Sequence, residues 1–147
     1  MLCKELQFGD WIADNNGFRW QIIGVGDDYA YATFEGNEGD PWEFDDKDDQ
    51  PEGIPLAKEM LDDNGFRYEK DYGPFYRSIL GSYSKDKEPL ICVQWNPQGE
   101  ISHWEVSNKS GILTGVVAYG YTEIAVHELQ HILRMVGLNN IADNFKV

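Results

Sequence analysis

Residues 126–137, near the end of the chain, constrain the fold more than any other stretch of the sequence. Apolar residues recur there at steps of three and four, which is the period of an amphipathic helix. Thr122 suits the N-cap of this helix, and Gly137 suits its C-terminal end. We expect the apolar face to pack on a sheet of earlier strands and the opposite face to be solvated. That polar face consists of His127, Gln130, His131 and Arg134.

The same helix carries the pattern His-Glu-x-x-His as His127, Glu128 and His131. Two histidines one turn apart can hold zinc, and the glutamate can activate a bound water as general base. A third protein ligand is not evident, because Asp143 is the only acid downstream and His103 is the only other histidine. We therefore assign no catalytic, cofactor-binding or metal-ligating residue, and a zinc hydrolase built on this motif stays the alternative.

The charge of the chain restricts its partners. The sequence has 26 acidic against 12 basic residues, for a net charge of -14. Nucleic acids and anionic membranes are polyanions, so we expect neither as a partner, whereas a protein with a basic surface fits. Residues 1–10 lack the apolar core of a signal peptide, and no run approaches the roughly 20 apolar residues of a membrane span. Cys3 and Cys92 are not in a C-x-x-C pair. We expect a cytoplasmic protein without a cysteine zinc site.

Acidic residues concentrate in residues 35–52. A calcium-binding loop that started at Asp46 would need Gly where Pro51 stands and a bidentate Glu where Ala57 stands. The pattern therefore indicates a solvated acidic loop, with weak cation binding or docking to a basic partner as the alternatives.

The N-terminal part, residues 1–52, is typical of a small SH3-like β-barrel module. Phe8, Trp11 and Ile12 mark a first strand, and the turn at residues 14–17 ends in Asn-Gly, the preferred pair for a tight hairpin. Further strands are predicted for residues 18–25, 29–34 and 42–44 from their alternating aromatic and apolar residues.

Residues 53–147 are expected to form an α+β portion that packs with the first as one compact unit. Pro55 suits the first position of a short middle helix, and Gly65 suits its exit. Strands are predicted for residues 66–70, 75–80, 90–95, 101–106 and 112–119. An antiparallel sheet with the C-terminal amphipathic helix on one face follows, and the tail at residues 139–147 is expected to dock loosely.

Three stretches together resemble a group of small proteins of unknown function from gut anaerobic bacteria and their phages and mobile elements. The stretches are residues 6–12, residues 54–56 leading to residues 64–66, and residues 126–131, in this order along most of the chain. Similar sequences can carry Gln at the position of Glu128 and Asn at the position of His131, which implies that the metalloprotease pattern does not define the group. The resemblance implies a bacterial or phage-related cytoplasmic origin and brings no activity or cofactor.

The first function hypothesis is a non-enzymatic binding or interaction protein. Five tryptophans and eight tyrosines favour either a well-filled core or a surface for a peptide or a sugar. Such a protein would use its acidic face or its aromatic β surface to meet another protein. The alternatives are the zinc hydrolase of His127, Glu128 and His131 and an acidic DNA mimic that blocks a nucleic-acid enzyme, although the acids are grouped rather than spaced in rows.

Overall fold

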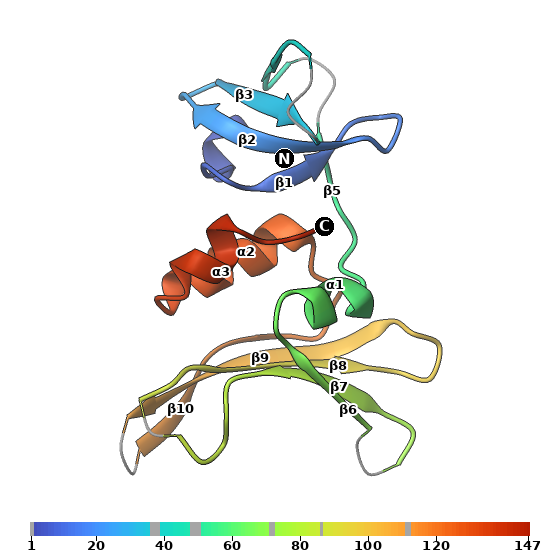
Figure 1. The fold of residues 1–147 in the computed structure, drawn as a ribbon, viewed down its shortest axis with the longest axis vertical. Helices are drawn as coiled ribbons and strands as arrows, with labels where there is room; N and C mark the ends of the chain where they lie inside the picture. The colour runs from blue at the N-terminus through green and yellow to red at the C-terminus, as the bar shows by residue number, and fades with distance from the viewer. Residues whose placement is uncertain (1, 36–38, 48–50, 71–72, 86, 111–112) are drawn as a thin grey trace. The chain divides into compact units, whose positions relative to one another are not determined.

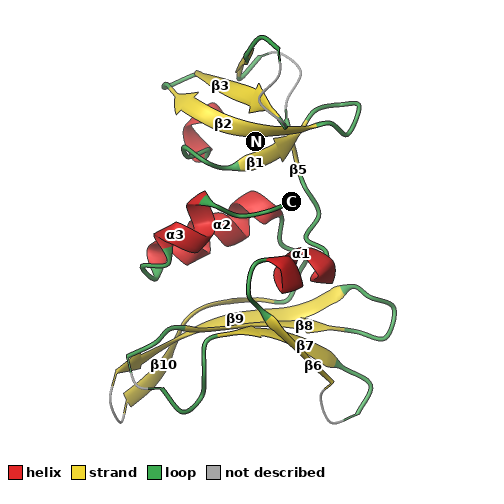
Figure 2. Ribbon diagram, in the orientation of Figure 1, coloured by secondary structure: helices red, strands yellow, loops and turns green. Residues whose placement is uncertain are grey.

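The computed structural model describes residues 2–35, 39–47, 51–70, 73–85, 87–110 and 113–147. Strands make up most of the regular structure and the helices are short, so the fold is of the α+β class, as the sequence predicts (Figure 2). Among the described residues, no helix combines the length and the apolar content that crossing a membrane requires. The acidic residues Glu38, Asp48 and Asp49 lie outside the described residues.

The described residues form two compact units. The first consists of Met1–Pro55, Ala125–Phe145 and Val147, so it is built from both ends of the chain. The second consists of Leu56–Ile124 and Lys146. The sequence-based division had assigned the C-terminal helix to residues 53–147 and to their sheet, whereas the structure groups it with the N-terminal strands.

The first unit contains a twisted antiparallel sheet in the order β4-β3-β2-β1-β5 (Figure 1). Its strands are β1 (Trp11–Ala13), β2 (Arg19–Val25), β3 (Tyr29–Phe34), β4 (Trp42–Asp45) and β5 (Glu52–Gly53). The predicted hairpin turn is confirmed, because β1 and β2 pair across residues 14–18 and Gly17 has a φ of 82° that a residue with a side chain rarely adopts. β5, which the sequence analysis did not predict, pairs with β1.

Alternation along the strands builds the core of this unit. Ala30 and Ala32 of β3 are fully buried, while Tyr29 and Tyr31, which alternate with them, point to the exposed side. The 3-10 turn η1 (Cys3–Glu5) contributes Cys3 to the buried side. The core cluster consists of Cys3, Leu6, Ile12, Ile22, Ala30, Ala32 and Phe44, with Trp20 and Trp42 packed against it.

Helix α2 (Val126–Met135) of the first unit corresponds to the predicted C-terminal helix. Its N-cap is Ala125 rather than the predicted Thr122, because the Glu128 carboxylate accepts a hydrogen bond from the Ala125 N–H at 3.1 Å and satisfies the helix start. The predicted stop is confirmed at Gly137, which has a φ of 85°.

The C-terminal tail also folds, and the prediction of loose docking is wrong. Residues Asn139–Asp143 form α3, which packs beside α2. Phe145 is 2% exposed, and its carbonyl oxygen accepts a hydrogen bond from the Trp11 indole N–H at 2.9 Å. The tail therefore closes one side of the first unit.

The second unit is an antiparallel sheet in the order β10-β9-β8-β7-β6, with the short helix α1 (Lys58–Asp63) against β6 and β7. Its strands are β6 (Arg67–Lys70), β7 (Tyr76–Leu80), β8 (Leu90–Trp95), β9 (Ile101–Ser110) and β10 (Leu113–Gly120). These agree with the predicted strands, except that β9 extends further along the chain. The predicted start of the middle helix at Pro55 is wrong, because α1 has Ala57 as its N-cap and Pro55 instead forms a β-bridge with Ala125.

Candidate functional site

The polar face of α2 is covered by the loop before β1, and the prediction that this face is solvated is wrong. Asp10 of that loop is 0% exposed. Its carboxylate accepts hydrogen bonds from His131 Nε2 at 2.6 Å and from Arg134 Nη1 at 2.7 Å. The N–H of Gln7 donates a third bond at 2.7 Å. A buried carboxylate needs such partners, because burying a charge without them is costly.

Gln130 lies at the centre of the same contact and is also 0% exposed. Its side-chain oxygen accepts a bond from the N–H of Trp11 at 2.9 Å. Its side-chain nitrogen donates to the carbonyl oxygens of Gly9 at 2.8 Å and of Ala142 at 2.9 Å. One glutamine thereby joins β1, α2 and α3. The polar residues of α2 serve the packing of the first unit.

The residues of the zinc motif line an open pocket of about 680 Å³ in the first unit, which we call the histidine pocket. Its lining consists of Glu5, Pro51, Glu52, Gly53, Ala125, His127, Glu128 and His131. The structure therefore brings all three motif residues together with two further glutamates. Gly53 permits β5 to approach the start of α2, because a Cβ there would lie 2.8 Å from the Ala125 Cβ.

Two of the three motif residues, His131 and Glu128, are engaged in other contacts. A carboxylate only accepts, so His131 Nε2 is a donor to Asp10 and holds its proton there. The Glu128 carboxylate caps α2. Among the described residues, no group of three or more His, Cys, Asp or Glu side chains lies close enough together to hold a metal ion. In this arrangement the pocket offers ionisable groups but not a formed zinc site.

His127 is the least satisfied member of the histidine pocket. Its Nδ1 is buried and has no hydrogen-bond partner among the described residues. Burial lowers the pKa of His127 below its ordinary value, against the opposing charges of Asp10 and Glu128. The ring of His131 stands edge-to-face with it at 5.8 Å between centroids. His127 is therefore favoured in its neutral form.

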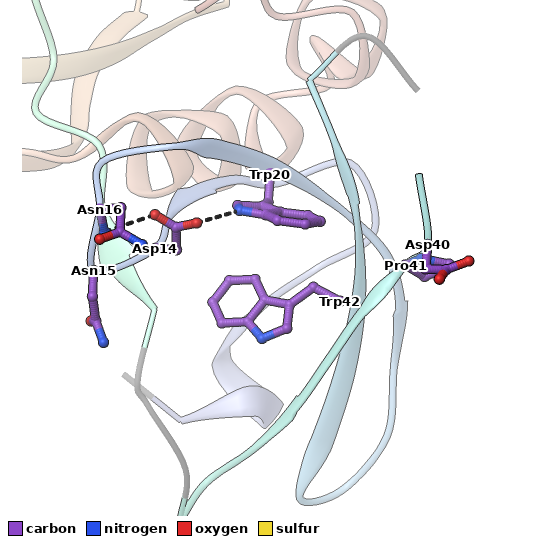
Figure 3. Close-up of a pocket in the computed structure, with 7 residues that line it drawn as sticks. All are labelled: Asp14, Asn15, Asn16, Trp20, Asp40, Pro41 and Trp42. Carbon is purple, nitrogen blue, oxygen red and sulfur yellow. Dashed lines mark hydrogen bonds between the residues drawn. The ribbon is translucent and has the colours of Figure 1, made fainter. Parts of the chain in front are cut away.

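A second pocket of the first unit, about 380 Å³ in volume, combines indole rings with carboxylates (Figure 3). We call it the tryptophan pocket. Its lining consists of Asp14, Asn15, Asn16, Trp20, Asp40, Pro41 and Trp42. The β1–β2 turn, β2 and the start of β4 with the two residues before it supply these residues, and β3 lies between β2 and β4 in the sheet.

Asp14 is held as an anion at one side of this pocket. Its carboxylate accepts bonds from the Trp20 indole N–H at 2.9 Å, the Asn16 N–H at 2.9 Å and the Phe18 N–H at 3.0 Å. Desolvation acts to raise the pKa of Asp14, but these hydrogen bonds outweigh it and the pKa is lowered. The bonds also fix the plane of the Trp20 ring.

The indoles of the pocket belong to an aromatic row across the sheet. Trp20 and Trp42 have ring centroids 5.4 Å apart at an interplanar angle of 56°. Phe34, directly opposite Trp20 in the β2–β3 register, packs edge-on against it at 5.2 Å. The ring centroids of Phe44 and Trp42 are 4.5 Å apart. Each indole is partly buried, so part of its surface is open to the pocket.

Asp40 provides a second carboxylate. Its side chain is exposed, and no ion pair or hydrogen bond joins it to another of the described residues. In the view of Figure 3, the two indoles lie between Asp14 and Asp40. The sequence analysis proposed an aromatic surface but did not identify these residues. The alternation of the strand places Trp20 on the same face as Phe18 and Ile22, but the sequence gives no sign of the register that brings Trp42 beside it.

Comparison of the chain with protein-family models, with curated proteins and with solved structures finds no match.

Proposed function

We propose that the protein is a non-enzymatic binding protein and that the tryptophan pocket receives a basic segment of another protein. The observation that carries the proposal is the pairing of two partly open indoles, Trp20 and Trp42, with the carboxylates of Asp14 and Asp40. Indole faces attract cations through the ring quadrupole, and the carboxylates add attraction of the same sign.

The charge of the whole chain supports this choice of partner. A net charge of -14 raises the encounter rate with a cationic segment and repels polyanions. A neutral sugar would use the indole faces but gain nothing from the carboxylates. The DNA-mimic hypothesis uses the acids but gives no role to the tryptophans.

The proposal includes the architecture and origin of the protein. We infer an SH3-like module in the first unit, since four strands in a meander followed by a fifth that returns to β1 is the strand order of such barrels. The register shift between Ile22 and Gly24 adds the curvature that a barrel needs. We place the protein in the cytoplasm of a bacterium, in keeping with the sequence resemblance.

The test is a titration of the isotopically labelled full chain with a short capped peptide that carries lysine and arginine in a Gly/Ser background. The indole N–H signals of Trp20 and Trp42 are expected to shift, and binding is expected to weaken at about 0.5 M salt, where charges are screened within about 4 Å. Asp40→Asn should weaken binding roughly two- to fivefold, as expected for an exposed ion pair.

The matched control is Asp27→Asn, which removes the same charge from the exposed turn between β2 and β3. It should change the affinity less than Asp40→Asn does. If both variants lose the same affinity, or if the peptide shifts the signals of other acidic loops as well, the binding comes from the overall negative charge of the chain. Either result would contradict the assignment to this pocket.

A zinc-dependent hydrolase is the second candidate, because His127, Glu128 and His131 line one pocket. A hydrolase would require His131 to leave Asp10 and Glu128 to leave the helix cap. Zinc bound per chain, measured after purification without a nickel column, is expected to be far below one. Stoichiometric zinc that is lost in His131→Ala and in His127→Ala, each checked for folding, would instead favour the hydrolase.

A further inference from the structure

We propose that the tryptophan pocket selects arginine over lysine by stacking a guanidinium group on the Trp20–Trp42 pair. This inference rests on the proposed function, since it names the side chain of the basic segment that the pocket recognises. Three features of the pocket favour arginine: the spacing of the rings, the hydrogen bonds already made by Asp14 and the position of Asp40.

The spacing of the indoles excludes a compact cation between them. Their centroids are 5.4 Å apart at 56°, and each ring also contacts a phenylalanine, Phe34 or Phe44. No cage of facing rings is left for a rounded ammonium group. A flat cation can still lie against the open part of one ring, and the guanidinium group is the flat cation among protein side chains.

The hydrogen bonds of Asp14 also favour a guanidinium group over an ammonium group. A carboxylate has about four acceptor positions, and the Trp20 indole N–H and two backbone N–H groups already occupy three of those of Asp14. Asp14 can therefore attract a cation by its charge but has little capacity to accept the several N–H bonds of an ammonium group. A guanidinium stacked on an indole directs its five N–H groups outward in its own plane, so they can reach acceptors other than Asp14.

Asp40 supplies the acceptor that Asp14 lacks. Its exposed side chain lies beyond the indoles from Asp14 in the view of Figure 3, with the carboxylate turned away from the rings, where a segment leaving the pocket could meet it. A segment that crosses the pocket would pass one anion, the indole pair and a second anion in turn. This arrangement fits an extended arginine-containing strand of another protein, with the aliphatic part of each arginine against the apolar rim that includes Pro41.

The experiment compares capped peptides of one Gly/Ser background that carry arginine, lysine or citrulline at the same positions. Citrulline keeps the planar shape of arginine but has no charge. The dissociation constant of the full chain for each peptide is measured, together with the proton shifts of the peptide side chains. The arginine peptide is expected to bind at least about threefold more tightly than the lysine peptide, which corresponds to the lower end of a cation–π contact. Its δ-methylene protons should move upfield because they lie over an indole ring.

Trp42→Phe is the variant that tests the ring itself. It keeps an aromatic side chain against Phe44 and the core, and it should remove most of the preference for arginine over lysine. Trp104→Phe makes the same change in β9 of the second unit and should leave the preference intact. A two-dimensional amide spectrum of each variant establishes that it is folded.

Each outcome decides one of the two claims. If arginine and lysine peptides bind equally and no upfield shift is seen, arginine selection is wrong while the docking of a basic segment stands. If citrulline binds as well as arginine, or no peptide binds, the proposed function fails with it. A preference for arginine that survives Trp42→Phe overturns the assignment of that preference to the indole pair.

Discussion

At the scale of single residues, the first unit depends on polar side chains that are fully buried. Asp10 and Gln130 are both 0% exposed, and most of their side-chain hydrogen bonds join the N-terminal part of the unit to the C-terminal helices. A buried polar group that is hydrogen-bonded adds little to the free energy of unfolding, but leaving it without its partner lowers that free energy strongly. The stability of this unit should therefore respond strongly to a single deletion of a polar side chain.

Gln130→Ala is expected to lower the free energy of unfolding of the first unit by about 2–4 kcal/mol, because buried backbone groups at Trp11 and Ala142 lose their partner. The measurement is urea unfolding followed by amide signals of the first unit. Gln98→Ala, in the exposed β8–β9 turn, should change it by less than about 0.5 kcal/mol. If Gln130→Ala lowers the free energy of unfolding as little as this control does, the hydrogen bonds of Gln130 do not stabilise the first unit.

The sequence did not reveal these contacts, although it contained all the residues. Helical periodicity placed Gln130, His131 and Arg134 on one side of the helix, and polar residues on a shared face usually meet water. Nothing local to the helix indicates that Asp10, more than a hundred residues earlier, covers that face. The candidate site was missed for a similar reason, because Trp20 and Trp42 meet only through the pairing of β2, β3 and β4.

At the scale of elements, the sequence was a better guide where local chemistry decides the structure. The turn at Gly17 and the helix end at Gly137 were predicted because both need a positive φ. The strands of the second unit were predicted as short runs of apolar and aromatic residues, with residues 96–99 as a clear turn between two of them. The helix starts were not, since Ala125 and Ala57 have no side chain that can cap a helix. The start of α2 is instead satisfied by the Glu128 carboxylate.

The contact between β5 and the start of α2 gives the first unit a pH dependence. A carbon at Gly53 would meet the His127 ring, so the imidazole is pressed against this strand. Its pKa is lowered by burial, which means that the unfolded chain binds the proton more readily than the folded one. The neutral His127 ring therefore makes its full contribution to the free energy of unfolding above its pKa in the unfolded chain, about 6.5. This contribution is lost as the pH falls through the lower pKa of the folded chain, because the buried ring must then take up a proton.

His127→Gln is therefore expected to lose less stability than the parent chain between about pH 7.5 and pH 5. Urea unfolding at a series of pH values in this window measures the difference. His103→Gln removes a histidine of the second unit and should leave the pH dependence of the first unit unchanged. If His127→Gln and the parent chain decline in parallel, the buried imidazole is not the source.

At the scale of the whole molecule, the first unit is discontinuous in sequence. Residues 1–55 supply its sheet, and residues 125–145 supply the partners of Asp10 and of the Trp11 N–H. The sheet by itself would leave the Asp10 carboxylate without His131 and Arg134 and β1 without its helix. Neither part is therefore expected to fold alone.

A fragment of residues 1–55 should show an unfolded circular dichroism spectrum and poorly dispersed amide signals. Co-expression with a fragment of residues 125–147 should restore dispersion, because it returns Gln130, His131 and Arg134 to the N-terminal loop. Adding the same fragment with Arg134→Ala and Gln130→Ala should restore much less. A well-dispersed spectrum from residues 1–55 alone would contradict the dependence.

The discontinuity also sets an order of events on the ribosome. The second unit, residues 56–124, emerges between the two parts of the first. At about 5–20 residues per second, its synthesis takes on the order of 3–14 s. The nascent N-terminal strands wait through that interval for the helices that supply the partners of Asp10 and of the Trp11 N–H. The part of the chain made first is thus the part completed last.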